Sequence, residues 1–230
     1  MMKHDPIGHA DNWGWRARFG IFIVASEAVP EAEWWAMVPS GVSVHAARVS
    51  ARAPWARWRT DPDLVAPQGQ VELADDLARG ANQFAAMRLE AIVVGHSSSS
   101  ILGGTGWDDA VVRRLQEIVS PETAVTTNGI DCVAALRASG VHRPLLVFPP
   151  WFSDALVGAG TNYFETHGFA PSDSLRAGPG RGWRDLAPDQ LYPQGMGFEQ
   201  DVEALYRQIR AACPQQADGV LIAGTGFRCV

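Results

Sequence analysis

The sequence lacks the features that mark metalloproteins, disulfide-rich proteins and membrane proteins. Its cysteines, Cys132, Cys213 and Cys229, are odd in number and show no CxxC spacing, which favours a reducing cytoplasm over a disulfide framework. No HExxH motif or Cys/His cluster occurs, so no metal is expected. No apolar run reaches the roughly 18 residues of a membrane span, and residues 1–18 hold no apolar segment of a secretory signal. We therefore expect a cytoplasmic protein with no membrane partner.

Charge is sparse and lacks a positive excess. Charged residues make up 19% of the 230 residues, and the net charge is −6. A protein that binds nucleic acid usually shows a basic face, so no nucleic-acid partner is expected. The acidic balance still permits an anionic ligand, because backbone amides and hydroxyls can bind a carboxylate without net positive charge.

Apolar runs alternate with helical patterns, which is typical of βα units around a parallel sheet. Strands are predicted over residues 19–24, 42–49, 91–94, 124–126, 144–148 and 220–223, and helices over 71–89, 108–119, 129–139, 153–167 and 199–212. Asp108 is expected to cap its helix. Residues 171–197 are rich in Gly, Pro and Arg and predict a long connection that can act as a lid.

The two halves of the chain share this rhythm. We predict an α/β fold of two pseudo-symmetric lobes, each a mainly parallel sheet flanked by helices, with the active-site cleft between them. The predicted division is an N-terminal extension over residues 1–17, a first lobe over 18–123 and a second lobe over 124–230. The closing strand and helix of the second lobe are expected but missing, because the sequence stops after a strand end.

The third predicted strand runs into a histidine and four serines. Ligands of open α/β sheets bind beyond the carboxyl ends of strands, where hydroxyls and helix amides make an anion site. His96 can transfer a proton at carbon, or it only donates a hydrogen bond. Ser97, Ser98 and Ser100 can hold a carboxylate, with helix capping as the alternative. Ser99 is expected to point inward.

The last predicted strand ends in a matching run of small residues. Gly224, Thr225 and Gly226 can offer backbone N–H groups and one hydroxyl to the same anion, although glycine also serves tight turns. Two such strand ends, one in each half, predict a single cleft.

Together these segments resemble the maleate cis-trans isomerase and arylmalonate decarboxylase family of the aspartate/glutamate racemase superfamily. The resemblance covers about residues 18–228 and rests on the order and spacing of several motifs. They are Ala25-Ser26-Glu27, residues 41–48, the serine run, Thr126-Thr127-Asn128, and residues 134–141, 162–169 and 224–228.

The resemblance implies a cofactor-free enzyme that works at the carbon next to a carboxylate, using cysteines at two strand ends. Those catalytic positions correspond here to His96 and Gly224, so both thiols are replaced. The family's tyrosine corresponds to Trp151, and its asparagine after the first strand to Ala28. The expected substrate-binding residues are Ser26, Ser97, Ser98, Asn128, Trp151, Thr225 and Gly226.

Other reactive residues fit the site less well. Cys229 lies beyond the second cysteine position and is not expected to swing back, whereas Cys132 is expected in a helix core. Glu27 and Glu31 are either acid/base groups or solvated carboxylates. The expected partner is a small carboxylate or dicarboxylate, and a homo-oligomer is left open. Isomerase or decarboxylase activity is expected, with a non-catalytic carboxylate-binding protein as the alternative.

Overall fold

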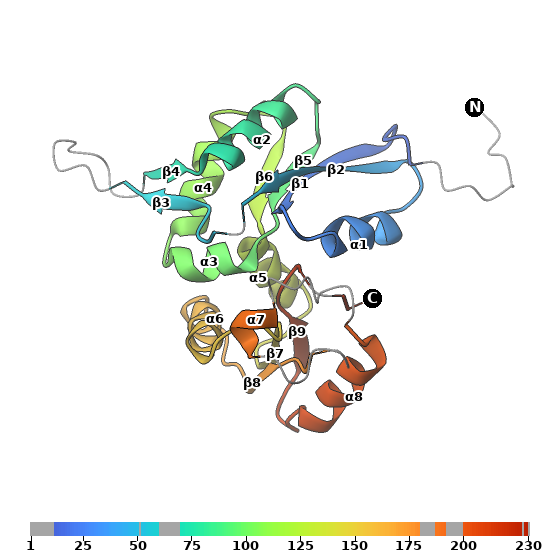
Figure 1. The fold of residues 1–230 in the computed structure, drawn as a ribbon, viewed down its shortest axis with the longest axis vertical. Coiled ribbons are helices and arrows are strands. Elements are labelled where there is room, and N and C mark those ends of the chain that lie inside the picture. The colour runs from blue at the N-terminus through green and yellow to red at the C-terminus, as the bar shows by residue number, and fades with distance from the viewer. Residues whose placement is uncertain are drawn as a thin grey trace, which may run out of the picture.

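The computed structural model describes residues 12–50, 52–59, 70–179, 187–191, 200–226 and 228–229. Two parallel sheets with flanking helices form the upper and lower parts of the molecule in Figure 1. The predicted α/β class is therefore confirmed. None of the described helices is long and apolar enough to cross a membrane.

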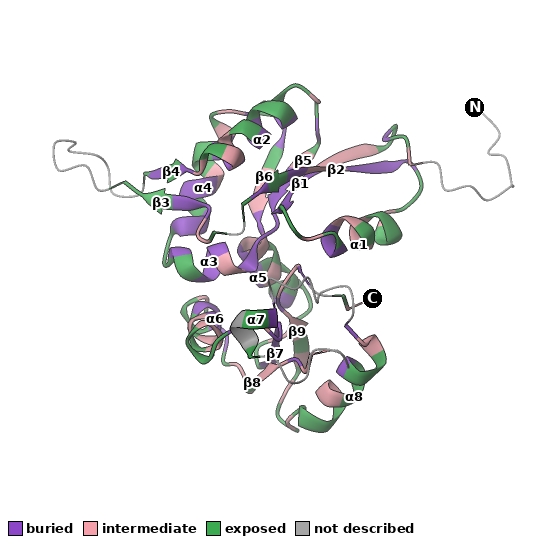
Figure 2. Ribbon diagram, in the orientation of Figure 1, coloured by how far each residue is buried: buried purple, intermediate pink, exposed green. Residues whose placement is uncertain are grey.

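The first sheet has the strand order β2-β1-β5-β6, and all of its neighbouring strands are parallel. Its strands are β1 (Ala17–Val24), β2 (Val42–Val49), β5 (Ala91–Val94) and β6 (Ala124–Thr127). The central strands β1 and β5 are buried where they pair (Figure 2), which explains their nearly continuous apolar runs.

Alternate side chains of β1 enter different cores, as the period of two along a strand requires. Phe22 and Val24 pack with α2 (Asp75–Ala85) and α4 (Trp107–Gln116) on one face. Ile21 and Ile23 pack on the other face, toward α1 (Val29–Met37). The first lobe is therefore a three-layered unit around its sheet.

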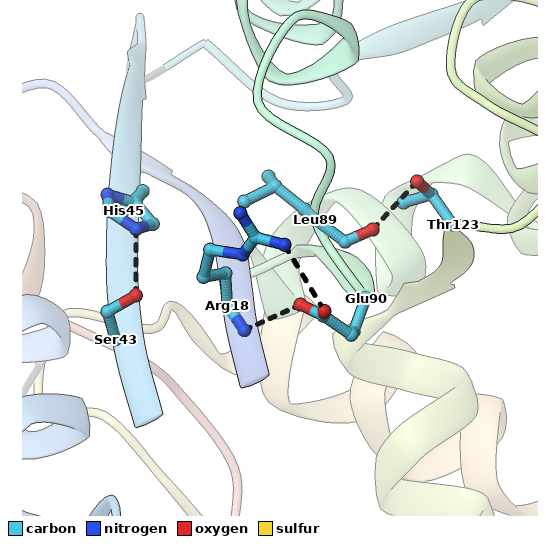
Figure 3. A network of polar contacts seen from close by, with 6 residues as sticks. All are labelled: Arg18, Ser43, His45, Leu89, Glu90 and Thr123. Carbon is cyan, nitrogen blue, oxygen red and sulfur yellow. Dashed lines mark hydrogen bonds and ion pairs between the residues drawn. The ribbon is translucent and has the colours of Figure 1, made fainter. Parts of the chain in front are cut away.

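Polar contacts fix the amino ends of the parallel strands (Figure 3). The backbone N–H of Arg18 donates to Glu90 Oε2 at 2.6 Å, and Thr123 Oγ1 donates to the Leu89 carbonyl at 2.8 Å. On β2, Ser43 Oγ lies 3.0 Å from His45 Nε2. These contacts lie at the end of the sheet opposite to the pocket described below, so they support the frame and not the site.

The second sheet has the order β8-β7-β9 and is also parallel. Its strands are β7 (Pro144–Phe148), β8 (Asp173–Arg176) and β9 (Gly219–Ile222). The helices of this lobe are α6 (Asp154–Thr166), α7 (Pro188–Leu191) and α8 (Val202–Ala212). The two sheets repeat one order of elements, because β1-α1-β2-α2-β5 corresponds to β7-α6-β8-α8-β9. The ends of β5 and β9 are therefore equivalent places.

The chain passes between the sheets through α5 (Asn128–Ala138). This helix follows β6, and its Val133 and Leu136 pack in one cluster with Leu146 and Phe148 of β7. The sheet boundary thus falls after β6, whereas the predicted division at residue 124 falls before it.

Two short strands correct the sequence prediction. The helix predicted over 71–89 begins only at Asp75, because Val71–Leu73 forms β4 and pairs antiparallel with β3 (Ala56–Trp58). The connection predicted over 171–197 contains β8, which pairs with β7, and α7. The rest of the predicted lid, residues 180–186 and 192–197, lies outside the described residues.

Candidate functional site

The ends of β5 and β9 meet at a pocket of about 200 Å³. A hydrogen bond between the lobes joins the two ends, because the Thr225 hydroxyl donates to the Gly95 carbonyl at 2.9 Å. Most of the predicted site residues line this pocket: His96, Ser97, Ser98, Trp151, Gly224, Thr225 and Gly226. Glu27, Ala53, Leu102, Pro149, Phe152 and Leu156 complete its wall.

His96 is held on two sides. Its ring stacks on the ring of Trp55 with centroids 4.2 Å apart, and its Nδ1 lies 2.8 Å from Ser99 Oγ. Ser99 Oγ also accepts the backbone N–H of Trp55 at 2.9 Å. With only 8% of the residue exposed, burial lowers the pKa of His96 from 6.5 to about 3. The imidazole is therefore neutral at pH 7.

The four serines divide into two pairs in α3 (Ser97–Gly103). Ser99 is bound to His96 and Trp55, and Ser100 Oγ donates to Asp108 Oδ1 at 2.7 Å. Among the described residues, the Ser97 and Ser98 hydroxyls have no protein partner, and both serines line the pocket. Ser99 thus points inward as expected, whereas Ser100 is not a pocket donor.

Asp108 has a different place from the predicted helix cap. The residue before α4 is Gly106, and Asp108 is buried. Besides Ser100, it accepts hydrogen bonds from the Thr127 hydroxyl at 2.6 Å and the Tyr163 hydroxyl at 2.8 Å. Tyr163 lies on α6 of the second lobe, so this network joins the lobes behind the pocket. Its carboxylate, together with burial, raises the pKa of the Tyr163 phenol.

The end of β9 presents mainly backbone. Gly224 has a φ of +133°, which favours glycine. Gly226 lies close against a carboxylate, because a Cβ atom placed there would stand 2.2 Å from Glu27 Oε1. Glu27 belongs to the turn after β1, and Arg48 Nη1 donates to its carbonyl at 2.7 Å. Glu27 is thus a pocket residue, whereas Glu31 forms an ion pair with Arg48.

Ser26 and Asn128 do not line the pocket. Ser26 is exposed after β1, and Asn128 opens α5, where its Oδ1 lies 3.9 Å from Cys132 Sγ. No thiol of the described chain lines the pocket either. Burial and nearby carboxylates raise the pKa of Cys132 to about 12, and burial and Glu33 raise that of Cys229 to about 11. Both thiols are therefore protonated at neutral pH.

Several pocket residues carry no motif in the sequence. Trp55 lies on a short segment before β3, and Leu102, Phe152 and Leu156 are ordinary apolar residues of helices and turns. The one available signal was the abundance of tryptophan, which suggested aromatic walls without saying which residues form them. Within the described residues there is no cluster of three His, Cys, Asp or Glu side chains that could hold a metal ion.

Comparison with known proteins identifies the fold. No family model matches the sequence, and no curated protein matches it. The maleate isomerase Iso from Pseudomonas putida S16, solved with maleate, has a TM-score of 0.67 at 15% identity, covering 92% of this chain and 79% of that one.

Two further solved structures show the same likeness. A Nocardia farcinica maleate cis-trans isomerase mutant with a covalently bound succinylcysteine intermediate has a TM-score of 0.63 at 18% identity, over 92% and 80% of the chains. An arylmalonate decarboxylase has a TM-score of 0.59 at 14% identity, over 92% and 78%. The chain therefore has the fold of maleate isomerases and arylmalonate decarboxylases.

Proposed function

We propose that the pocket binds a small carboxylic acid and that the protein transfers a proton at the carbon next to the carboxylate, as an isomerase- or decarboxylase-like enzyme without a cofactor. One observation carries the proposal. The end of β5 brings a buried, neutral histidine together with two hydroxyls that have no protein partner among the described residues. The fold shared with maleate isomerases and arylmalonate decarboxylase supports the same class of substrate.

The carboxylate is held by the Ser97 and Ser98 hydroxyls, which donate to its oxygens. His96 accepts the proton of the α-carbon on Nε2, while Nδ1 keeps its contact with Ser99. The electron pair of the broken C–H bond moves into the carboxylate and forms an enediolate, whose added charge strengthens the serine hydrogen bonds. The bound anion raises the pKa of the otherwise weakly basic imidazole and so favours this step. Return of the proton regenerates His96.

His96 and Gly224 stand where the resembling family carries its two cysteines, so this reaction uses no thiol. Hydrogen exchange at the α-carbon, followed by NMR in heavy water, tests it with 2-phenylpropionate and with maleate. The wild type is expected to exchange the α-hydrogen of one of these acids. His96→Ala should slow exchange by at least about 100-fold, the usual contribution of a positioned acid or base.

His142→Ala is the matched control, because His142 is exposed and lies outside the pocket. It should keep the wild-type rate. Exchange that persists in His96→Ala would contradict the role of His96.

A non-catalytic carboxylate-binding protein is the second candidate. It is favoured by the low pKa of His96, which makes the free imidazole a poor base, and by the lack of a thiol among the described pocket residues. This candidate predicts that an acid raises the melting temperature of the protein while no exchange and no product are detected.

A further inference from the structure

The pocket has two ends that differ in charge. At the end of β5 stand the Ser97 and Ser98 hydroxyls and the neutral His96. At the end of β9 stands the carboxylate of Glu27, packed against the backbone of Gly226. Among the described residues that line the pocket there is no lysine or arginine.

The Glu27 carboxylate fills the space that a ligand's second carboxylate would use. The turn that carries it is fixed, because Arg48 Nη1 donates to the carbonyl oxygens of Ala25 and Glu27. Gly226 gives the carboxylate its room, since any Cβ there would meet Oε1 at 2.2 Å and Cδ at 2.6 Å. The Thr225 hydroxyl has already donated its proton to Gly95. The end of β9 therefore offers an anion a negative charge and no hydroxyl proton.

The remaining wall is apolar. Leu102, Pro149, Phe152 and Leu156 line the space between the two ends. Burying an alkyl or aryl group against this wall is favourable, whereas burying a second charge without a partner is costly.

We propose, on the basis of the proposed function, that the site selects an acid with a single carboxylate and an apolar substituent on the α-carbon, and that Glu27 excludes a second carboxylate. The single carboxylate binds at Ser97 and Ser98, the substituent packs on the apolar wall, and Glu27 faces the remaining position of the α-carbon. Glu27 is thus a residue that determines specificity.

Calorimetric titration with a matched pair of acids tests this selection. 2-Phenylpropionate and phenylmalonate differ by a methyl group in place of a second carboxylate. At pH 8 the wild type should bind the monoanion about tenfold or more tightly than the dianion, because the second charge meets Glu27. Glu27→Gln keeps the shape and removes the charge, and should bring the ratio of the two dissociation constants to within about threefold. Glu27→Ala should do the same and adds space.

Glu31→Gln is the control, since it removes a nearby negative charge outside the pocket and should keep the wild-type ratio. A wild type that prefers the dianion, or a Glu27→Gln ratio equal to that of the wild type, would overturn the inference alone. Equal losses of both affinities in Ser97→Ala/Ser98→Ala support the underlying carboxylate site. Binding of neither acid, or no effect of the serine changes, would overturn the proposed function as well.

Discussion

The end of β5 and the end of β9 hold equivalent places in two sheets of matching strand order, yet they present different groups to the pocket. The end of β5 supplies side chains, namely a histidine and two hydroxyls. The end of β9 supplies backbone that lies under the carboxylate of Glu27. The pseudo-symmetry of the fold therefore does not extend to its chemistry, and we assign ligand binding mainly to the first strand end.

The two ends also differ in how they are anchored. Behind β5, the buried Asp108 accepts three hydroxyl hydrogen bonds from Ser100, Thr127 and Tyr163. After β9, the side-chain contact with the β5 end is the single bond from Thr225 to Gly95. If this difference holds, changes behind β5 should cost far more stability than changes after β9.

Asp108→Ala is expected to have the largest effect. It leaves three buried hydroxyl donors without their acceptor, at about 1–3 kcal/mol each before relaxation, so we expect a loss of about 4 kcal/mol in the free energy of unfolding. Urea denaturation measures it. Asp108→Asn keeps one acceptor oxygen and should lose less. A loss below about 1 kcal/mol in Asp108→Ala would show that the network does not anchor the β5 end.

Gly103→Ala should rank second. A Cβ atom at this position would meet the indole ring of Trp107 at 2.1–2.5 Å. Trp107 cannot yield easily, because it is fully buried and its indole N–H donates to the Ala56 carbonyl at 2.8 Å. We expect a loss of about 2–3 kcal/mol, as for overpacked cores. Gly140→Ala is no control, since its φ is positive; Gly158→Ala has open space and should be tolerated.

The burial of His96 predicts a dependence of stability on pH. The folded pKa of about 3 lies below the ordinary 6.5, so between these values the unfolded chain binds a proton that the folded chain does not. The stabilisation is complete above pH 6.5 and is lost as the pH falls toward 3. It should amount to about 2 kcal/mol between pH 7 and pH 5.

Urea denaturation at both pH values gives this difference. His96→Gln should remove most of the slope, whereas the exposed His142→Gln should retain it. An unchanged slope in His96→Gln would mean that the imidazole is not buried as described.

Thr225→Val should have the smallest effect. It removes the one hydroxyl that joins the β9 end to Gly95, and we expect a loss of about 1 kcal/mol, typical of a single neutral hydrogen bond. The comparison with Asp108→Ala is the informative quantity. A Thr225→Val loss as large as that of Asp108→Ala would refute the difference in anchoring.

The sequence was sufficient to predict the sheet class and the meeting of the two strand ends, because long apolar runs followed by small polar residues are local signals. It was not sufficient for β4 and β8, whose three or four residues include charged side chains and depend on pairing with β3 and β7. Short strands of this kind are set by tertiary contacts.

The division of labour among the serines could not be predicted from four identical neighbours. Their orientation is set by distant partners, Trp55 for Ser99 and Asp108 for Ser100. In the same way, the approach of Glu27 to Gly226 joins opposite ends of the chain. The composition of the pocket was thus predictable in kind, while the assignment of each side chain needed the fold.

A crystal structure of the protein with bound 2-phenylpropionate tests the central claim most directly. The account predicts that the carboxylate lies within hydrogen-bond distance of the Ser97 and Ser98 hydroxyls, that the α-carbon faces His96, and that the phenyl ring packs on Leu102 and Phe152. A carboxylate bound instead to the backbone of Gly224–Gly226, with Glu27 displaced, would contradict it.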